Sequence, residues 1–127
     1  MKPNLVLSVI CDYALISSDN KLSVMGIFHE INVRELPAVH PAFFVVLQWL
    51  GGIGRHEEKI TIVDPRGREL TAHQDQFELK LASQGHVGLI RYSPFRFEFA
   101  GEYLIKVELD GEPVRDISFN IVQIKEQ

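Results

Sequence analysis

The sequence contains a single cysteine, Cys11, and so it lacks any pair of thiols that could form a disulfide within the chain. One cysteine also excludes the cysteine-rich zinc sites, which need several thiolate ligands. Cys11 alternates with Val9 and Tyr13 along an apolar stretch, and this pattern predicts a buried side chain. Because a thiol in apolar surroundings stays protonated and unreactive, we expect Cys11 to have a structural role.

Long hydrophobic runs are absent as well. A helix that crosses a bilayer needs about 20 apolar residues, whereas the longest apolar run here, Phe43–Leu50, includes Gln48 and has the length of a strand. The apolar stretch Leu5–Ile10 is short and no Ala-x-Ala cleavage site follows it, so we expect a first strand there rather than a signal peptide. The sequence therefore predicts a cytoplasmic protein without a membrane partner.

Basic residues are too few and too scattered for a nucleic-acid surface. The chain has 13 Lys and Arg against 17 Asp and Glu, a formal net charge of −4, and no basic stripe. Its 127 residues, of which 46% are hydrophobic, are enough for a core without disulfides or metals. We therefore expect one domain, residues 1–127, and no nucleic-acid partner.

What the sequence does have is period-two alternation of apolar and polar residues, which is typical of strands with one buried face. The alternating segments are 60–63, 77–81, 95–99, 103–109 and 117–121. Between them, Asp64-Pro65-Arg66-Gly67 predicts a β-turn, and Asp110-Gly111 is a strong signal for a two-residue hairpin. Tyr103 follows Gly101-Glu102 at the start of a strand and resembles the tyrosine corner of immunoglobulin-like domains, in which the hydroxyl bonds back to the backbone. These features predict an all-β fold: a two-sheet antiparallel β-sandwich of the immunoglobulin-like, Greek-key type with about eight or nine strands.

Two N-terminal segments depart from this alternation, because residues 5–16 and 43–50 are apolar on both faces. A strand that is apolar on both faces needs cover on both. One explanation is a loop or short helix of the same chain folded over the outer face. The other is a subunit interface, since large uncovered apolar patches are rare on monomers. The residues that we expect at such an interface are Val6, Ile10, Phe44, Val46 and Leu50.

The sequence shows no assembled catalytic motif. It has no serine in G-x-S-x-G, and Gly51-Gly52-Ile53-Gly54 lacks the lysine and helix of a phosphate loop, so we expect a hairpin tip there. The histidines have no metal-ligand spacing, and we expect them in loops or on the surface. They are His29, His40, His56, His73 and His86. We therefore expect no enzymatic activity, no catalytic residue, no cofactor and no metal.

Two further hypotheses concern individual side chains. Asp12 is a carboxylate within an apolar strand, so it must reach solvent, find a hydrogen-bond partner or have a raised pKa. Together with Tyr13 and His40 it would form a small-ligand or metal site, provided that the three side chains converge. Trp49 would bind a sugar ring if its own ring were exposed, although aromatic residues interleaved with valine and leucine usually lie in a core.

Three short motifs carry a resemblance to a known family. They are Cys11-Asp12-Tyr13-Ala14, then Lys21-Leu22-Ser23 with Gly26-Ile27-Phe28, and then His40-Pro41 with Phe43. In this pattern the chain resembles a family of small, mostly bacterial all-β proteins classed as a domain of unknown function. The resemblance implies an all-β fold and supplies no activity or catalytic residues.

The functional hypothesis that follows is a non-enzymatic binding or assembly module that acts through protein contacts. Self-association through the N-terminal strands is the first form of it, so the partner is a second copy of the chain or another protein. The alternatives are a small-ligand or metal site near Asp12, Tyr13 and His40, and carbohydrate binding through Trp49.

Overall fold

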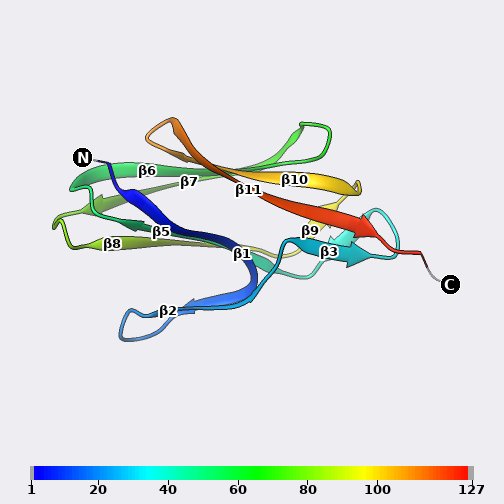
Figure 1. Ribbon diagram of the computed structural model, residues 1–127, viewed down its shortest axis with the longest axis horizontal. Helices are drawn as coiled ribbons and strands as arrows, with labels where there is room; N and C mark the ends of the chain where they lie inside the picture. Colours follow the sequence, from blue (N-terminus) through cyan, green and yellow to red (C-terminus); the bar gives the residue numbers. More distant parts are fainter. Residues whose placement is uncertain (1, 126–127) are drawn as a thin grey trace.

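A computed structural model describes residues 2–125 and shows an all-β protein, as predicted, with no helix in that range (Figure 1). The strands are β1 (Asn4–Ile16), β2 (Leu22–Ile27), β3 (Glu30–Val33), β4 (Ala38–His40), β5 (Phe43–Leu50), β6 (Gly54–Val63), β7 (Glu69–Leu79), β8 (Gly85–Tyr92), β9 (Phe95–Phe97), β10 (Gly101–Leu109) and β11 (Glu112–Gln123).

The strands form two larger sheets and one small one. Their orders are β2-β1-β5-β8, β3-β11-β10-β6-β7 and β4-β9. The prediction of about eight or nine strands is wrong, because β3, β4 and β9 have only three or four residues each and are too short to show an alternation. The prediction of purely antiparallel sheets is also wrong, since β3 runs parallel to β11, with Ile31 opposite Ile121. The local pattern of apolar and polar residues does not predict a pairing between segments so distant in the chain.

One hydrophobic cluster is shared by the two larger sheets, which form two layers in Figure 1. The four-stranded sheet supplies Ile10, Phe43, Val45, Leu47 and Trp49, and the five-stranded sheet supplies Ile60, Ile62, Phe77, Leu79, Tyr103, Ile105, Val107, Leu109, Phe119 and Ile121. Each fully buried large side chain contributes about 1.5–3 kcal/mol relative to exposure. This cluster is therefore the main source of stability in the described chain.

The predicted turn between β10 and β11 and the predicted tyrosine corner are both confirmed. Asp110 and Gly111 have φ of 51° and 82°, as a two-residue hairpin requires, and Leu109 pairs with Glu112. The Tyr103 hydroxyl donates to the Phe99 carbonyl at 2.7 Å and accepts from the Phe99 N–H at 3.3 Å. Both contacts are formed by residues close in sequence, which is why the sequence could predict them.

The predicted hairpin at Gly51–Gly54 is wrong. This segment connects β5 of the four-stranded sheet to β6 of the five-stranded sheet, so the strands on either side of it are not neighbours. It crosses from one layer to the other and passes the chain's N-terminal end, where a Cβ on Gly52 would lie 2.3 Å from the Pro3 nitrogen. The glycine is therefore needed here for close packing of two backbones.

Candidate functional site

The five residues predicted at an interface lie in three different environments. Val6 and Leu50 are exposed near the beginning of β1 and the end of β5. Ile10 is 1% exposed and belongs to the main core. A bulge between Leu5 and Leu7 shifts the register of β1, so that Leu5 and Ile10 both pack against the core although they are five positions apart, an odd spacing that would otherwise place them on opposite faces. Phe44 and Val46 are buried in a second cluster.

This second cluster lies on the back of the four-stranded sheet, because Phe44 and Val46 alternate with the core residues Phe43 and Val45. Its buried members are Cys11, Ala14, Phe44 and Val46, and Leu7, Val9, Leu22, Val24, Val87 and Leu89 pack around them. Leu22 and Val24 come from β2, and Figure 1 shows β2 outside the layer formed by β5 and β8. Part of the doubly apolar surface is thus covered from within the chain, by the β1–β2 hairpin.

Cys11 is fully buried in this second cluster, as the sequence predicted for its side chain. Burial is the largest influence on this thiol and raises its pKa. A raised pKa keeps the sulfur protonated near neutral pH, which agrees with a packing role.

The β1–β2 hairpin reaches the back of the sheet because the pattern of hydrogen bonds between β1 and β2 switches once along the hairpin. At the tip, Ser17 N–H donates to the Lys21 carbonyl at 2.9 Å, and at the base Phe28 N–H donates to the Ile10 carbonyl at 3.1 Å. In an antiparallel ladder, hydrogen-bonded and non-hydrogen-bonded pairs alternate. The bond from Ser17 to Lys21 means that odd-numbered residues form the hydrogen-bonded pairs near the tip. The bond from Phe28 to Ile10 means that even-numbered residues form them at the base. The alternation is therefore interrupted between the tip and the base.

The interruption lies at Asp12 and Gly26, which face each other across the hairpin. The register runs from Cys11–Ile27 to Tyr13–Met25, and Gly26 has a φ of 70°. A Cβ on Gly26 would lie 2.4 Å from Asp12 Oδ2, so the carboxylate occupies the space that any other side chain would need. This pairing explains a charged residue within an apolar strand.

Beyond the interruption, the hairpin has an exposed apolar surface, which we call the hairpin face. It consists of Tyr13, Leu15 and Met25, which are 48%, 37% and 50% exposed. Tyr13 and Met25 are direct partners, and Leu15 follows Tyr13 by two residues, so all three share one side of the hairpin. The Tyr13 ring also contacts Phe44 edge-on, with 5.4 Å between centroids, which holds the hairpin against the second cluster.

The structure does not bring the predicted polar site together. Asp12 packs against Gly26 and Tyr13 contacts Phe44, whereas His40 lies on β4 between the rings of Phe28 and Phe43, with centroids 6.4 and 6.1 Å away. Within residues 2–125, no group of three or more His, Cys, Asp or Glu side chains is placed to hold a metal ion.

The predicted sugar-binding role of Trp49 requires an exposed ring, and the ring is fully buried. Its Nε1–H donates to Glu58 Oε2 at 2.7 Å. Glu58 itself is 1% exposed and reaches from β6 into the four-stranded sheet, where it lies against Gly88. Burial is the largest influence on this carboxyl group and raises its pKa, and the nearby charge of Asp75 raises it further.

Two of the five histidines lie on strands and are withdrawn from solvent, against the expectation of loop or surface positions: His56 is buried and His86 is partly buried. His86 is stacked on Phe77, with 4.2 Å between ring centroids, and burial lowers its pKa. His56 Nδ1 lies 2.9 Å from Asp110 Oδ2, and its Nε2 lies 2.7 Å from the Gly52 carbonyl. Neither Glu58 nor His56 could be singled out from the sequence, because Glu58 bonds to Trp49 of the other sheet and His56 faces Asp110, a turn residue distant in the chain.

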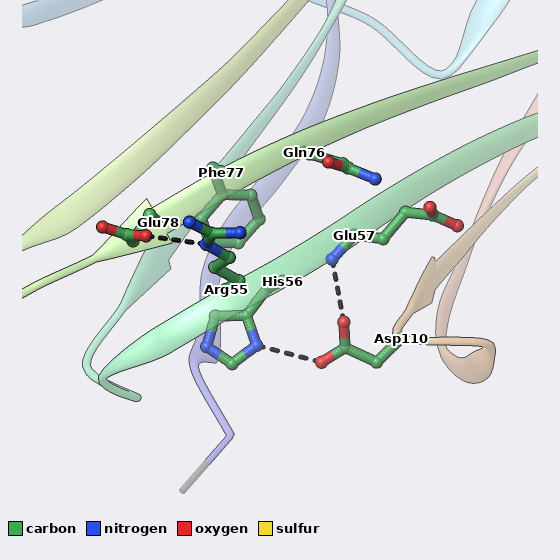
Figure 2. Close-up of a pocket in the computed structure, with 7 residues that line it drawn as sticks. All are labelled: Arg55, His56, Glu57, Gln76, Phe77, Glu78 and Asp110. Carbon is green, nitrogen blue, oxygen red and sulfur yellow. Dashed lines mark hydrogen bonds and ion pairs between the residues drawn. The ribbon is translucent and has the colours of Figure 1, made fainter.

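A pocket of about 510 Å³ opens beside His56 (Figure 2). It is lined by Arg55, His56, Glu57, Gln76, Phe77, Glu78 and Asp110. Arg55 is paired with Glu78 at 3.0 Å, and Asp110 accepts from the Glu57 N–H at 2.8 Å as well as facing His56. The hydrogen bond to His56 is the largest influence on Asp110 and lowers its pKa. These polar groups already bond to one another, so their arrangement ties the turn at Asp110 to β6.

Comparison with known proteins identifies one family model, the Family of unknown function (DUF6941), which matches residues 6–122. A search of curated proteins gave no match. Within the described residues, no helix is long and apolar enough to cross a membrane.

Proposed function

The chain belongs to a family of unknown function, DUF6941, and we propose from its geometry that it is a non-enzymatic assembly module that binds another protein chain through the β1–β2 hairpin. The hairpin face, Tyr13, Leu15 and Met25, is the observation that supports this proposal. Its side chains are large, apolar and one third to one half exposed, and they are adjacent on a single surface. Exposed apolar residues that adjoin one another mark contact surfaces more often than isolated ones do.

The position of the hairpin favours the same role. It extends from the four-stranded sheet and lies outside the layer of β5 and β8 (Figure 1), so a partner can approach it without displacing the core. The second cluster supports the hairpin, because Leu22 and Val24 pack in it and the Tyr13 ring contacts its member Phe44. A surface held in place before binding loses less conformational entropy when a partner orders it.

The proposed scaffold is a Greek-key sandwich of the immunoglobulin-like type. The core shared between the two larger sheets and the Tyr103 corner support this assignment. In such a scaffold, connections and edge hairpins carry the binding residues while the sheets stay fixed.

The experiment that tests the proposed function is the solution mass of the protein, measured by light scattering and sedimentation over a wide concentration range. We expect a mass above that of one chain, increasing with concentration. Met25→Lys places a charge in the hairpin face and should return the protein to one chain per particle. Val114→Lys is the matched control, since Val114 is 42% exposed on β11, and it should leave the mass unchanged.

Both variants must first show a wild-type unfolding transition, which the fluorescence of the single tryptophan reports. A protein that stays monomeric at the highest concentration, or a mass that Met25→Lys and Val114→Lys affect equally, would overturn the proposed function.

A further inference from the structure

We infer that the partner at the hairpin is a second copy of this chain, and that the two copies join by antiparallel pairing of their β2 strands. This inference rests on the proposed function and specifies its partner and its geometry. The two four-stranded sheets would then continue into each other across β2, with a two-fold axis at the junction.

The first argument is the charge of the strands at the ends of the sheets. The two larger sheets end in β2 and β8, and in β3 and β7. Edge strands present unpaired backbone groups, and proteins usually protect them with charged residues or proline. β8 contains Arg91, β3 contains Glu30, and β7 contains Glu69, Asp75 and Glu78, whereas β2 has neither a charged residue nor a proline.

The absence of charge on β2 also favours a second copy over a different partner. When a strand pairs with itself about a two-fold axis, each of its charges lies near the same charge of the other copy, and like charges opposite each other are destabilising. Pairing of β7 with itself would bring acidic residues together. Pairing of β2 with itself brings together only apolar residues, Ser23 and Gly26.

The ladder of the hairpin fixes the register. Since the bond from Ser17 to Lys21 assigns hydrogen-bonded pairs with β1 to odd-numbered residues, the even-numbered residues of this half of β2 direct their N–H and C=O groups away from β1. These residues are Leu22 and Val24, with Gly26 at the interruption. A two-fold axis at Val24 pairs Val24 with its own copy and places Leu22 opposite Gly26 of the other, so that the outward backbone groups of Leu22 and Val24 face the other strand.

In this register the odd-numbered residues form the close, non-hydrogen-bonded pairs, with about 4.5 Å between Cα atoms. Ser23 of one copy lies opposite Met25 of the other, and each copy's Met25 adjoins its own Tyr13. The two hairpin faces thereby become one continuous apolar surface. Because each copy has one β2 edge, the pairing closes at two chains and leaves no free β2 for growth.

The test is register-specific disulfide formation between two variants that each carry one cysteine in addition to Cys11. Ser23→Cys and Met25→Cys are purified with tags of different size and are oxidised separately and as a mixture. We expect a mixed disulfide at least tenfold more abundant than either homodisulfide. In the proposed register, position 23 of one copy lies directly opposite position 25 of the other, whereas the two copies of position 23, and the two copies of position 25, are only diagonal neighbours. Wild-type protein is the control for Cys11, which is buried, and a mixture of Ser23→Cys with Val114→Cys is the control for random collision.

Hydrogen exchange of the unmodified protein gives a second measurement that does not depend on the variants. The amides of Leu22 and Val24, which point away from β1, should become protected when the concentration rises through the dimerisation range, and amides of β8, the other end of the same sheet, should not. If the protein forms a dimer by mass but shows neither the mixed disulfide nor protection of the Leu22 and Val24 amides, the edge pairing is overturned and the proposed function stands. A protein that never dimerises overturns both.

Discussion

The substitution Gly88→Ala tests whether Glu58 is held between the sheets as described. Gly88 is on β8 and is not among the glycines with positive φ, so the backbone there accepts alanine. The new Cβ would lie 2.4 Å from Glu58 Oε1 and 2.6 Å from Oε2, well inside normal contact distance. Glu58 cannot turn to solvent easily, since it is 1% exposed and bonded to Trp49.

The expected effect follows from three contributions. Overpacking in a core costs about 1–3 kcal/mol, and displacement of the carboxyl group from the Trp49 N–H removes a hydrogen bond to a group that carries charge when ionised, about 1.5–3 kcal/mol. Against these, replacing glycine by alanine at an ordinary φ stabilises by about 0.4–1 kcal/mol, because it restricts the unfolded chain. The balance predicts a loss of about 2–5 kcal/mol in the free energy of unfolding.

The assay is urea unfolding followed by the fluorescence of Trp49, the only tryptophan in the chain and a direct neighbour of Glu58. The control is Gly88→Ala in a Glu58→Ala background, where the cost of the alanine at position 88 should fall below about 1 kcal/mol because the colliding carboxyl group is gone. If Gly88→Ala leaves stability unchanged or increases it, or if the cost is the same in both backgrounds, Glu58 does not occupy this space.

Two further predictions concern buried polar groups. Tyr103→Phe should lower the free energy of unfolding by about 1–3 kcal/mol, because the Phe99 N–H and carbonyl lose their partner, and a urea midpoint equal to that of the wild type would contradict this. For Glu58 the folded-state pKa is raised, so its contribution to stability is fully present below the ordinary glutamate pKa of about 4.3 and is lost as pH rises through the folded-state pKa. The free energy of unfolding of the wild type minus that of Glu58→Gln should therefore fall with increasing pH in a series of urea titrations. A difference that stays flat or rises would refute the assignment.

The parts of the fold that the sequence predicts are those determined by neighbouring residues. Asp110-Gly111 specifies its own turn, Tyr103 reaches a carbonyl four residues away, and the alternation in 103–109 places Ile105 and Val107 in the core. The doubly apolar pattern of 43–50 correctly indicates burial on both faces of β5, where Phe43 and Phe44 are both buried. The pattern does not indicate which part of the chain covers the second face of β5.

The second face of β5 is covered as it is because β1 changes register by one residue at two points, and these changes are not visible in the alternation of apolar and polar residues. The bulge after Leu5 and the interruption at Asp12 each exchange the two faces of the strand, so a residue assigned to an interface, Ile10, lies in the core. Likewise, Glu58 follows His56 and Glu57 in a polar stretch that resembles a solvated strand. Its burial is determined by Trp49 and Gly88 of the opposite sheet, and only the assembled fold brings these together.

The parallel pairing of β3 with β11 has a kinetic consequence. It joins Glu30–Val33 to residues 120–123, and bonds from Asn120 N–H to the His29 carbonyl and from Ile124 N–H to the Val33 carbonyl secure its two ends. Contacts between segments so far apart in the chain require the closure of a long loop before any stabilising contact forms, which slows folding. The β10–β11 hairpin forms from local contacts, whereas the attachment of β3 requires the whole segment between β3 and β11 to close into a loop.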